Sequence, residues 1–273
     1  MRIYYSGYNY NMNIKNHFLV VSLLGFSHIA HSFTVKQPTS IKSRLSMSKL
    51  QDNHQAPIHQ DKLIKQNLAI AYRFLAKHNM DELTYTHLSA RSSDNNSFYI
   101  YPFGMLFAEV TADKLLKVSF DGEILEGSEY QYNDTGYNTH SAIYQQRPDI
   151  NAVFHLHTVA GEAISCLKTG LITNLSQHSL HFYPDQINYH SYDSLALNKQ
   201  QGNDLVQALG DKFIAISNNH GTWTCGKTIA EAMFNTWHLE RSCQVQMQSI
   251  SASGGDISKL TLIPESIAAK TAK

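Results

Sequence analysis

The chain has 273 residues and a formal net charge of zero, with 22 lysines and arginines against 22 aspartates and glutamates. Hydrophobic residues make up 42% of it, which excludes a disordered or collagen-like chain and is enough for the core of one large α/β domain. A protein that neutralises many phosphates would be basic, so we expect no nucleic-acid partner. The three cysteines fit neither a zinc ribbon nor a C-x-x-C pair, which favours reduced thiols and a cytoplasmic location.

The first part of the chain differs from the rest. Residues 1–55 show little helical or strand periodicity, and we predict a poorly ordered N-terminal extension there. An apolar run from Phe18 to Phe26 resembles the core of a signal peptide, which makes export the alternative to a cytoplasmic location. The run is much shorter than the ~20 apolar residues that span a membrane, so we predict no membrane association. We expect one folded domain over residues 56–262 and a short tail over 263–273.

The first half of the folded domain is predicted to hold a helix, a strand and a hairpin. Apolar side chains recur at helical spacing over residues 58–78, which predicts a helix with one buried stripe. Aromatic and β-branched residues over 97–101 predict a strand. An Asp-Gly pair separates residues 115–120 from 123–125, which is a strong signal for a β-hairpin.

The second half alternates helices and strands irregularly, which predicts a single α/β domain with a mixed sheet between helical layers. The strand FIAIS has no polar face, so we expect it to be buried on both sides. Thr228 begins the long last helix and Glu231 follows three residues later, as in a capping box, whereas Asn203 is expected to begin the helix before it. The predicted elements are helices over 138–147, 159–167, 203–209 and 228–248 and strands over 152–158 and 213–217.

Two histidines stand near the end of a predicted strand. In the run AVFHLHT, His155 and His157 are two residues apart, so their side chains point to the same face of the strand. Two adjacent buried imidazoles are costly unless something pairs with both. A divalent cation does so, because neutral histidine is the commonest metal ligand. The alternative is that both rings bond backbone carbonyls.

A third histidine follows the next buried strand. His220 and Gly221 belong to the run NNHG directly after FIAIS, a place where α/β proteins commonly carry their sites. Gly221 lets the backbone turn tightly or approach a ligand closely, and taken alone the run is also that of an ordinary turn. With the first two histidines it completes a set of three, which leaves an open coordination position as in catalytic zinc sites. Imidazole also suits iron, cobalt and nickel, so the set does not select one metal.

Five segments together resemble the class II aldolase/adducin family: YTHLSAR at 85–91, IYPFGML at 100–106, HSAIYQQRPDINAVFHLHTVAGEAIS at 140–165, NNHGTW at 218–223 and SASGGDISKL at 251–260. The resemblance covers roughly residues 60–262 and implies a single three-layer α/β/α domain with a central, mostly antiparallel sheet. It also implies a homotetramer and a zinc ion held by His155, His157 and His220. The activity it implies is that of a lyase acting on a small hydroxy-carbonyl compound through a metal-stabilised enediolate.

The chain departs from the family at the position of the catalytic base. The family's aldolases place a glutamate four residues before the histidine of the HSAIY helix, and here that position is Gly136. Glycine has no side chain and cannot act as a general base. Asp134 and Tyr137 are the nearest substitutes, although neither has the expected spacing. Thr86 and His87 stand where the family's aldolases carry a Gly-Asn pair that contacts a phosphate.

Two functions follow from this combination. The first is a metal-dependent lyase, because three histidines with a free coordination position are difficult to explain otherwise. The second is a non-catalytic oligomeric scaffold, because glycine followed by an aromatic residue before HSAIY resembles the head domain of adducins. Adducins bind actin and spectrin through a long basic tail, whereas only Lys270 and Lys273 lie near the end of this chain, so no such partner is expected.

Several other residues are expected to be structural. We interpret His140 as a packing residue, Cys225 as a buried inert thiol, and Arg91 and Arg147 as salt-bridge residues. A loop-rich stretch after the predicted helix at 159–167 carries three more histidines. For these we expect packing at the surface or at an interface: His178, His181 and His190.

Overall fold

The computed structural model describes residues 55–192 and 194–272. The run from Phe18 to Phe26 and nearly all of the predicted extension lie outside the described residues. The helices are α1 (Gln55–Lys77), α2 (Asp134–Gln146), α3 (Val159–Ser165), α4 (Lys199–Leu209), α5 (Ile229–Ala252) and α6 (Glu265–Thr271). The strands are β1 (His87–Arg91), β2 (Ser97–Ile100), β3 (Leu116–Ser119), β4 (Ile124–Glu126), β5 (Ala152–Leu156), β6 (Ile187–His190), β7 (Ile214–Ser217) and β8 (Gly221–Gly226). Within these ranges no helix is long and apolar enough to cross a membrane.

The strands form one sheet in the order β4-β3-β2-β1-β5-β8-β7-β6. Every neighbouring pair is antiparallel except β6 and β7, which run parallel. This confirms the predicted central, mostly antiparallel sheet. The strands that carry the motifs, β1, β5 and β8, are direct neighbours in the middle of the sheet, although they lie far apart along the chain.

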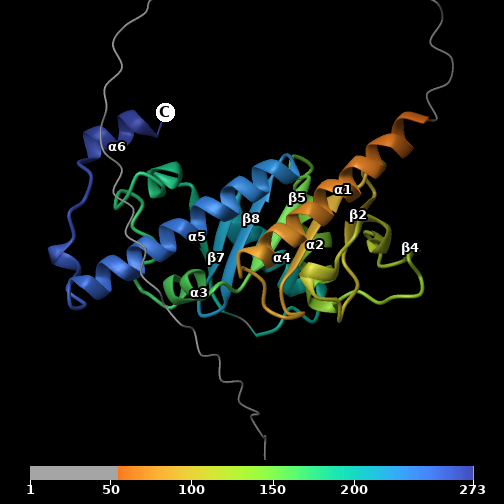
Figure 1. The fold of residues 1–273 in the computed structure, drawn as a ribbon, viewed down its shortest axis with the longest axis horizontal. Coiled ribbons are helices and arrows are strands. Elements are labelled where there is room, and N and C mark those ends of the chain that lie inside the picture. The colour runs from red at the N-terminus through yellow and green to blue at the C-terminus, as the bar shows by residue number, and fades with distance from the viewer. Residues whose placement is uncertain (1–54, 193, 273) are drawn as a thin grey trace, which may run out of the picture. The chain divides into compact units, whose positions relative to one another are not determined.

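Helices cover both faces of the sheet, as the α/β/α prediction requires. On one face, α1 and α5 pack against each other, and Thr236 of α5 bonds Thr224 of β8 (Figure 1). On the other face, α2 packs against α4, and Tyr144 of α2 bonds the hydroxyl of Ser89 in β1. Because successive strand residues point to opposite faces, alternate residues of β1 and β5 face these two layers. The odd-numbered residues, which include both predicted strand histidines, face α2.

The helix starts follow from their caps. Thr228 accepts a hydrogen bond from the backbone N–H of Glu231 and begins α5 as predicted. Asn133 caps α2 by accepting from the N–H of Thr135, so this helix begins four residues earlier than predicted. The prediction that Asn203 begins the helix now seen as α4 was wrong. Asn198 caps α4 instead, and the helix gains a turn because this asparagine already satisfies the first free N–H groups.

Three strands were not predicted: β1, β6 and β8. Every residue of β1 and β8 is buried, so neither strand shows the alternation of polar and apolar residues that marks a half-buried strand. The buried strand predicted at 213–217 is confirmed as β7, whose residues are all buried. Residues 263–273, predicted as a tail, contain α6, in which Ala268 is fully buried.

Candidate metal centre

The sheet brings the three predicted histidines together. His155 is the fourth residue of β5, and His157 lies just beyond the end of that strand. His220 is in the tight turn between β7 and β8, where Asn219 adopts a positive φ of 57° that asparagine tolerates. Because β5 and β8 are antiparallel, the end of one lies beside the start of the other, and Leu156 pairs with Thr222. One ligand atom from each histidine lies within 4.8 Å of those of the other two.

The ring nitrogens have the spacing of a metal site. The Nε2 atom of His155 is 2.9 Å from that of His157 and 3.3 Å from that of His220. Two imidazole nitrogens bound at 2.0–2.1 Å to a tetrahedral ion lie about 3.4 Å apart, so the observed separations are close to those of a loaded site. Imidazole nitrogens that face one another with their lone pairs repel unless a cation lies between them.

Hydrogen bonds fix which nitrogen of two of these rings faces the centre. The Nδ1 of His155 lies 3.1 Å from the carbonyl oxygen of Thr222, and the Nδ1 of His157 lies 2.7 Å from a carboxylate oxygen of Glu82. Carbonyl and carboxylate oxygens only accept, so both Nδ1 atoms carry the proton and both Nε2 atoms keep a lone pair. Metal-binding histidines commonly have this arrangement, in which an oxygen acceptor orients the ring.

Burial keeps the imidazoles in the form that binds metals. The pKa of His155 is far below its ordinary value, first because the ring is buried and then because His157 and His220 are close. Burial, followed by the proximity of His157 and His190, lowers the pKa of His220 to about 4. A neutral imidazole is a ligand, whereas an imidazolium is not. The three residues therefore fit a divalent cation, and the donor set suits zinc as well as iron, cobalt or nickel.

Aromatic rings and a small cavity surround the cluster. The ring of Trp223 stacks on that of His155 at 3.8 Å between centroids and lies nearly parallel to it, while its Nε1 donates to the hydroxyl of Ser217. The rings of Tyr192 and His220 are perpendicular, with centroids 6.2 Å apart. A cavity of about 30 Å³ adjoins His220 and is lined by residues of α2, β6, β7, β8 and α4, together with Ser194 and Ala196. His157 and His220 are only partly buried, so the cluster is reachable from solvent on that side.

No carboxylate occupies the position of the family's base. Gly136 lies in the first turn of α2 and faces the ring of His87; a Cβ added there would lie 3.0 Å from Cδ2 of that ring. Asp134 is exposed at the start of the same helix. The hydroxyl of Tyr137 donates to the carbonyl of Phe120, at the hairpin rather than at the histidine cluster. An imidazole therefore fills the space that a side chain at position 136 would need.

Sequence reasoning missed Glu82, His87 and Trp223. The 79–85 loop carries Glu82 to His157, and Leu83 next to it adopts a positive φ of 45°. His87 is the direct cross-strand partner of His155, and Trp223 pairs with His155 from the other side. If β1 and β8 had been recognised as strands beside β5, His87 and Trp223 could have been identified as the residues that pair with His155. Nothing in the local sequence indicates the loop contact of Glu82.

The expected structural residues have the following contacts. His140 is fully buried, Cys225 is buried with its pKa raised to about 12 by burial, and Arg147 pairs with Asp149 at 2.7 Å. Within the part of the chain that the structure describes, Arg91 forms no salt bridge, contrary to the prediction: its guanidinium donates to the carbonyls of Tyr144, Arg147 and Ile150. These carbonyls at the end of α2 and in the following turn need donors, which a guanidinium supplies. His181 bonds Asn235, and His190 bonds Ser217.

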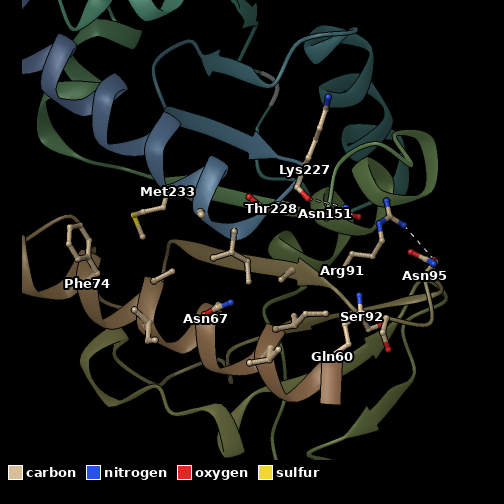
Figure 2. Close-up of a pocket in the computed structure, with 18 residues that line it drawn as sticks. Gln60, Asn67, Phe74, Arg91, Ser92, Asn95, Asn151, Lys227, Thr228 and Met233 are labelled. Carbon is tan, nitrogen blue, oxygen red and sulfur yellow. Dashed lines mark hydrogen bonds between the residues drawn. The ribbon is translucent and has the colours of Figure 1, made fainter. Parts of the chain in front are cut away.

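A second cavity lies away from the histidines. It is a groove of about 570 Å³ between α1 and the start of α5, on the face of the sheet opposite the histidines. Figure 2 shows Phe74 and Met233 at one end of the groove and Arg91, Ser92 and Asn95 at the other. None of the three clustered histidines lines it, so the chemistry of the metal centre is separate from this groove.

The sequence matches the family described as the class II aldolase and adducin N-terminal domain over residues 66–247. The chain belongs to this family. A Pseudomonas aeruginosa protein provisionally named an aldolase class 2 protein is 42% identical over 203 residues, which are 74% of this chain and 76% of that protein. Rat alpha-adducin is 33% identical over 215 residues, which are 77% of this chain but only 29% of the adducin.

Solved structures of class II aldolase proteins have the same fold. An aldolase II superfamily protein from Pseudomonas syringae superposes with a TM-score of 0.73 at 38% identity, covering 78% of this chain and 84% of that one. An L-fuculose 1-phosphate aldolase from Glaciozyma antarctica superposes with a TM-score of 0.68 at 29% identity, covering 78% and 81%. The fold predicted from the sequence motifs is thus confirmed.

Replacing Glu82 with glutamine is expected to lower metal affinity about 10- to 100-fold, because the amide cannot orient and polarise His157 as the carboxylate does. Competition with a coloured chelator measures the affinity. Glu129→Gln, another exposed glutamate, is the control and should leave it unchanged. Equal affinities for the wild type and Glu82→Gln would contradict the role of this carboxylate.

Replacing Gly221 with alanine is expected to destabilise the fold by about 1–3 kcal/mol and to weaken metal binding. The added Cβ would lie 2.5 Å from the carbonyl oxygen of Leu156 and 2.9 Å from Cδ2 of His157, so β5 and a ligand of the centre must shift. Urea unfolding and a metal titration test both effects. Gln131→Ala on an exposed loop serves as the reference. If Gly221→Ala were as stable as this reference and bound metal as tightly, the close approach of Gly221 to Leu156 and His157 would not be critical.

Proposed function

We propose that this protein is a metal-dependent lyase, with zinc as the expected ion, that acts on a small hydroxy-carbonyl compound. The observation that supports this most strongly is the convergence of three imidazoles, in which the Nε2 atom of His155 lies 2.9 Å and 3.3 Å from those of the other two, close to the separation expected around a tetrahedral ion. Two of the rings are held by an oxygen acceptor on the far side, as in metal centres of known proteins. Three protein ligands leave one coordination position for substrate.

His155, His157 and His220 would hold the ion. When bound, a divalent cation supplies Lewis-acid polarisation of a carbonyl oxygen. Trp223 covers one face of His155, which limits the access of water from that side. No side chain at Gly136 takes up a proton, and general base catalysis typically contributes about 10²- to 10⁴-fold. We therefore expect turnover to be slower by about this factor than in family members that carry the glutamate.

The experiment is a screen for retro-aldol cleavage of short hydroxy-aldehydes, hydroxy-ketones and their phosphates by protein with one metal ion per chain. Turnover that disappears in folded His157→Ala protein supports the lyase. The absence of turnover with every compound in fully loaded wild-type protein would overturn it. Exposed His59→Ala is the control for effects of losing a histidine elsewhere.

A second candidate is a non-catalytic, metal-bearing scaffold. It is favoured by Gly136 and by the His87 ring that fills the neighbouring space, together with the similarity to adducins. It predicts that removal of metal alters stability or assembly while no substrate is turned over. Light scattering with and without a chelator, run beside the activity screen, distinguishes the two.

We also propose a cytoplasmic homotetramer that binds a small carbonyl compound. Family membership supports the assembly, and the three free cysteines support a reducing compartment. Multi-angle light scattering of the purified protein tests the tetramer, and a monomer at micromolar concentration would contradict it.

A further inference from the structure

His87 belongs to a row of side chains that crosses the middle of the sheet. It pairs with His155 on the next strand, which in turn pairs with Trp223, so all three side chains face α2. The rings of His87 and His155 have centroids 5.1 Å apart. Gly136 of α2 lies opposite, and a Cβ built there would meet the Cγ, Cδ2 and Nε2 atoms of His87 at 3.0–3.3 Å. The His87 ring therefore lies between the three-histidine centre and Gly136 of α2.

A chain of buried hydrogen bonds holds this ring from behind. The Nδ1 of His87 is 2.8 Å from the Nε2 of His140. The Nδ1 of His140 bonds the hydroxyl of Ser89, and that hydroxyl is 2.8 Å from the hydroxyl of Tyr144. All four side chains are at most 2% exposed, so water does not compete for these bonds. Among the described residues, the Nε2 of His87 has no hydrogen-bond partner.

The tyrosine end of the chain sets its direction. Among the described residues Ser89 is the hydrogen-bond partner of the buried Tyr144 hydroxyl, so that hydroxyl gives its proton to Ser89, since it would otherwise be left unpaired. Ser89 then donates to Nδ1 of His140, which donates from Nε2 to Nδ1 of His87. A neutral His87 whose Nδ1 accepts must carry its proton on Nε2.

We propose that His87 presents this Nε2–H as a hydrogen-bond donor to a negatively charged oxygen of the substrate, next to the three-histidine centre. His87 is a substrate-positioning residue. It places a hydrogen-bond donor beside Gly136, where the family's aldolases carry a base. A fixed donor at a site where negative charge lies or develops stabilises that charge without reorganisation. The inference rests on the proposed function for the presence of a chelating substrate. The inference narrows the substrate class to 2-hydroxy compounds whose carboxylate or enolate oxygen can extend from the metal centre to His87.

The tautomer of His87 is measured independently of metal and activity. Long-range proton–nitrogen NMR correlations of protein with ¹⁵N-labelled histidines report which nitrogen is protonated, and the signals that vanish in His87→Gln identify the residue. We expect the proton on Nε2 in the metal-free and the zinc-loaded protein, and Ser89→Ala to abolish this preference. A proton on Nδ1 would mean that the chain of hydrogen bonds runs in the opposite direction, and would overturn the proposal.

The donor role is tested by titrating glycolate into cobalt-loaded protein and following the visible spectrum of the metal. We expect His87→Phe to weaken glycolate binding about 10- to 100-fold, the effect of losing a hydrogen bond to a charged group, at unchanged cobalt affinity. His87→Gln retains an N–H donor and should restore most of the binding. His59→Gln is the control. Should His87→Phe not fold, Ser89→Ala is titrated in its place, because it leaves the His87 ring present and weakens only its orientation.

The outcomes separate the two proposals. Equal glycolate affinity in wild type and His87→Phe would overturn the donor role and leave the metal-dependent lyase standing. No glycolate binding to cobalt-loaded wild-type protein would overturn the donor role, whereas the lyase is decided by turnover in the cleavage screen. A loss of cobalt affinity in His87→Phe would show that His87 acts on the metal ligands instead, which would also overturn the donor role.

Discussion

Replacing His157 with alanine is expected to reduce the metal content from about one ion per chain to nearly none. Two imidazoles remain in this variant, and the affinity should fall by more than the 10- to 100-fold that follows loss of a residue that only orients a ligand. His157 is the suitable position because its side chain is 16% exposed and is not packed in the core, unlike His155. Elemental analysis of purified protein, supported by a calorimetric titration, measures the change.

His59→Ala is the matched control, because this exposed histidine of α1 lies outside the cluster. Circular dichroism must show that both variants are folded. If His157→Ala retains a full complement of metal, the ion is not held by the three-histidine cluster, and the proposed lyase loses its main support.

The stability of the metal-free protein is expected to fall by about 5 kcal/mol between pH 7.5 and pH 5.5, of which about 4 comes from three fully buried histidines and about 1.4 from His220, whose pKa is lowered to about 4. Burial, followed by the nearby charges of His157 and His220, lowers the pKa of His87 to about 3. Burial also places the pKa values of His140 and His155 well below the ordinary value of 6.5. All three are therefore neutral in the folded protein throughout this range and become protonated near pH 6.5 only when the chain unfolds.

The sign follows from proton binding. Below pH 6.5 the unfolded state binds more protons than the folded state, so acid favours unfolding. The stability is present above pH 6.5 and is lost as the pH falls toward the lowered folded pKa values. Each of the three residues contributes up to about 1.4 kcal/mol per pH unit. Urea unfolding in the presence of a chelator measures the loss; His59→Gln should show the same loss, and a pH-independent midpoint would contradict the buried neutral histidines.

Local patterns determined much of the fold and part of the site. The periodicity of α1, the Asp-Gly hairpin and the Thr228 cap depend on neighbours within a few residues, so the sequence predicts them directly. The same is true of His155 and His157, because the two-residue period of a strand places both on one face. The third histidine, His220, was proposed from its place after the buried strand FIAIS, and its position beside the pair depends on how β8 pairs with β5.

Only the tertiary structure decided what surrounds these histidines. Glu82 reaches His157 across 75 residues of chain, and His140 reaches His87 across 53. His87 appeared in the sequence only as a departure from a phosphate motif, and Gly136 only as a missing base; the fold shows that the first fills the space left by the second. Such contacts depend on strand register and on the seating of a helix over a sheet. Both are set by burial of side chains from distant segments, and no short stretch of sequence contains that information.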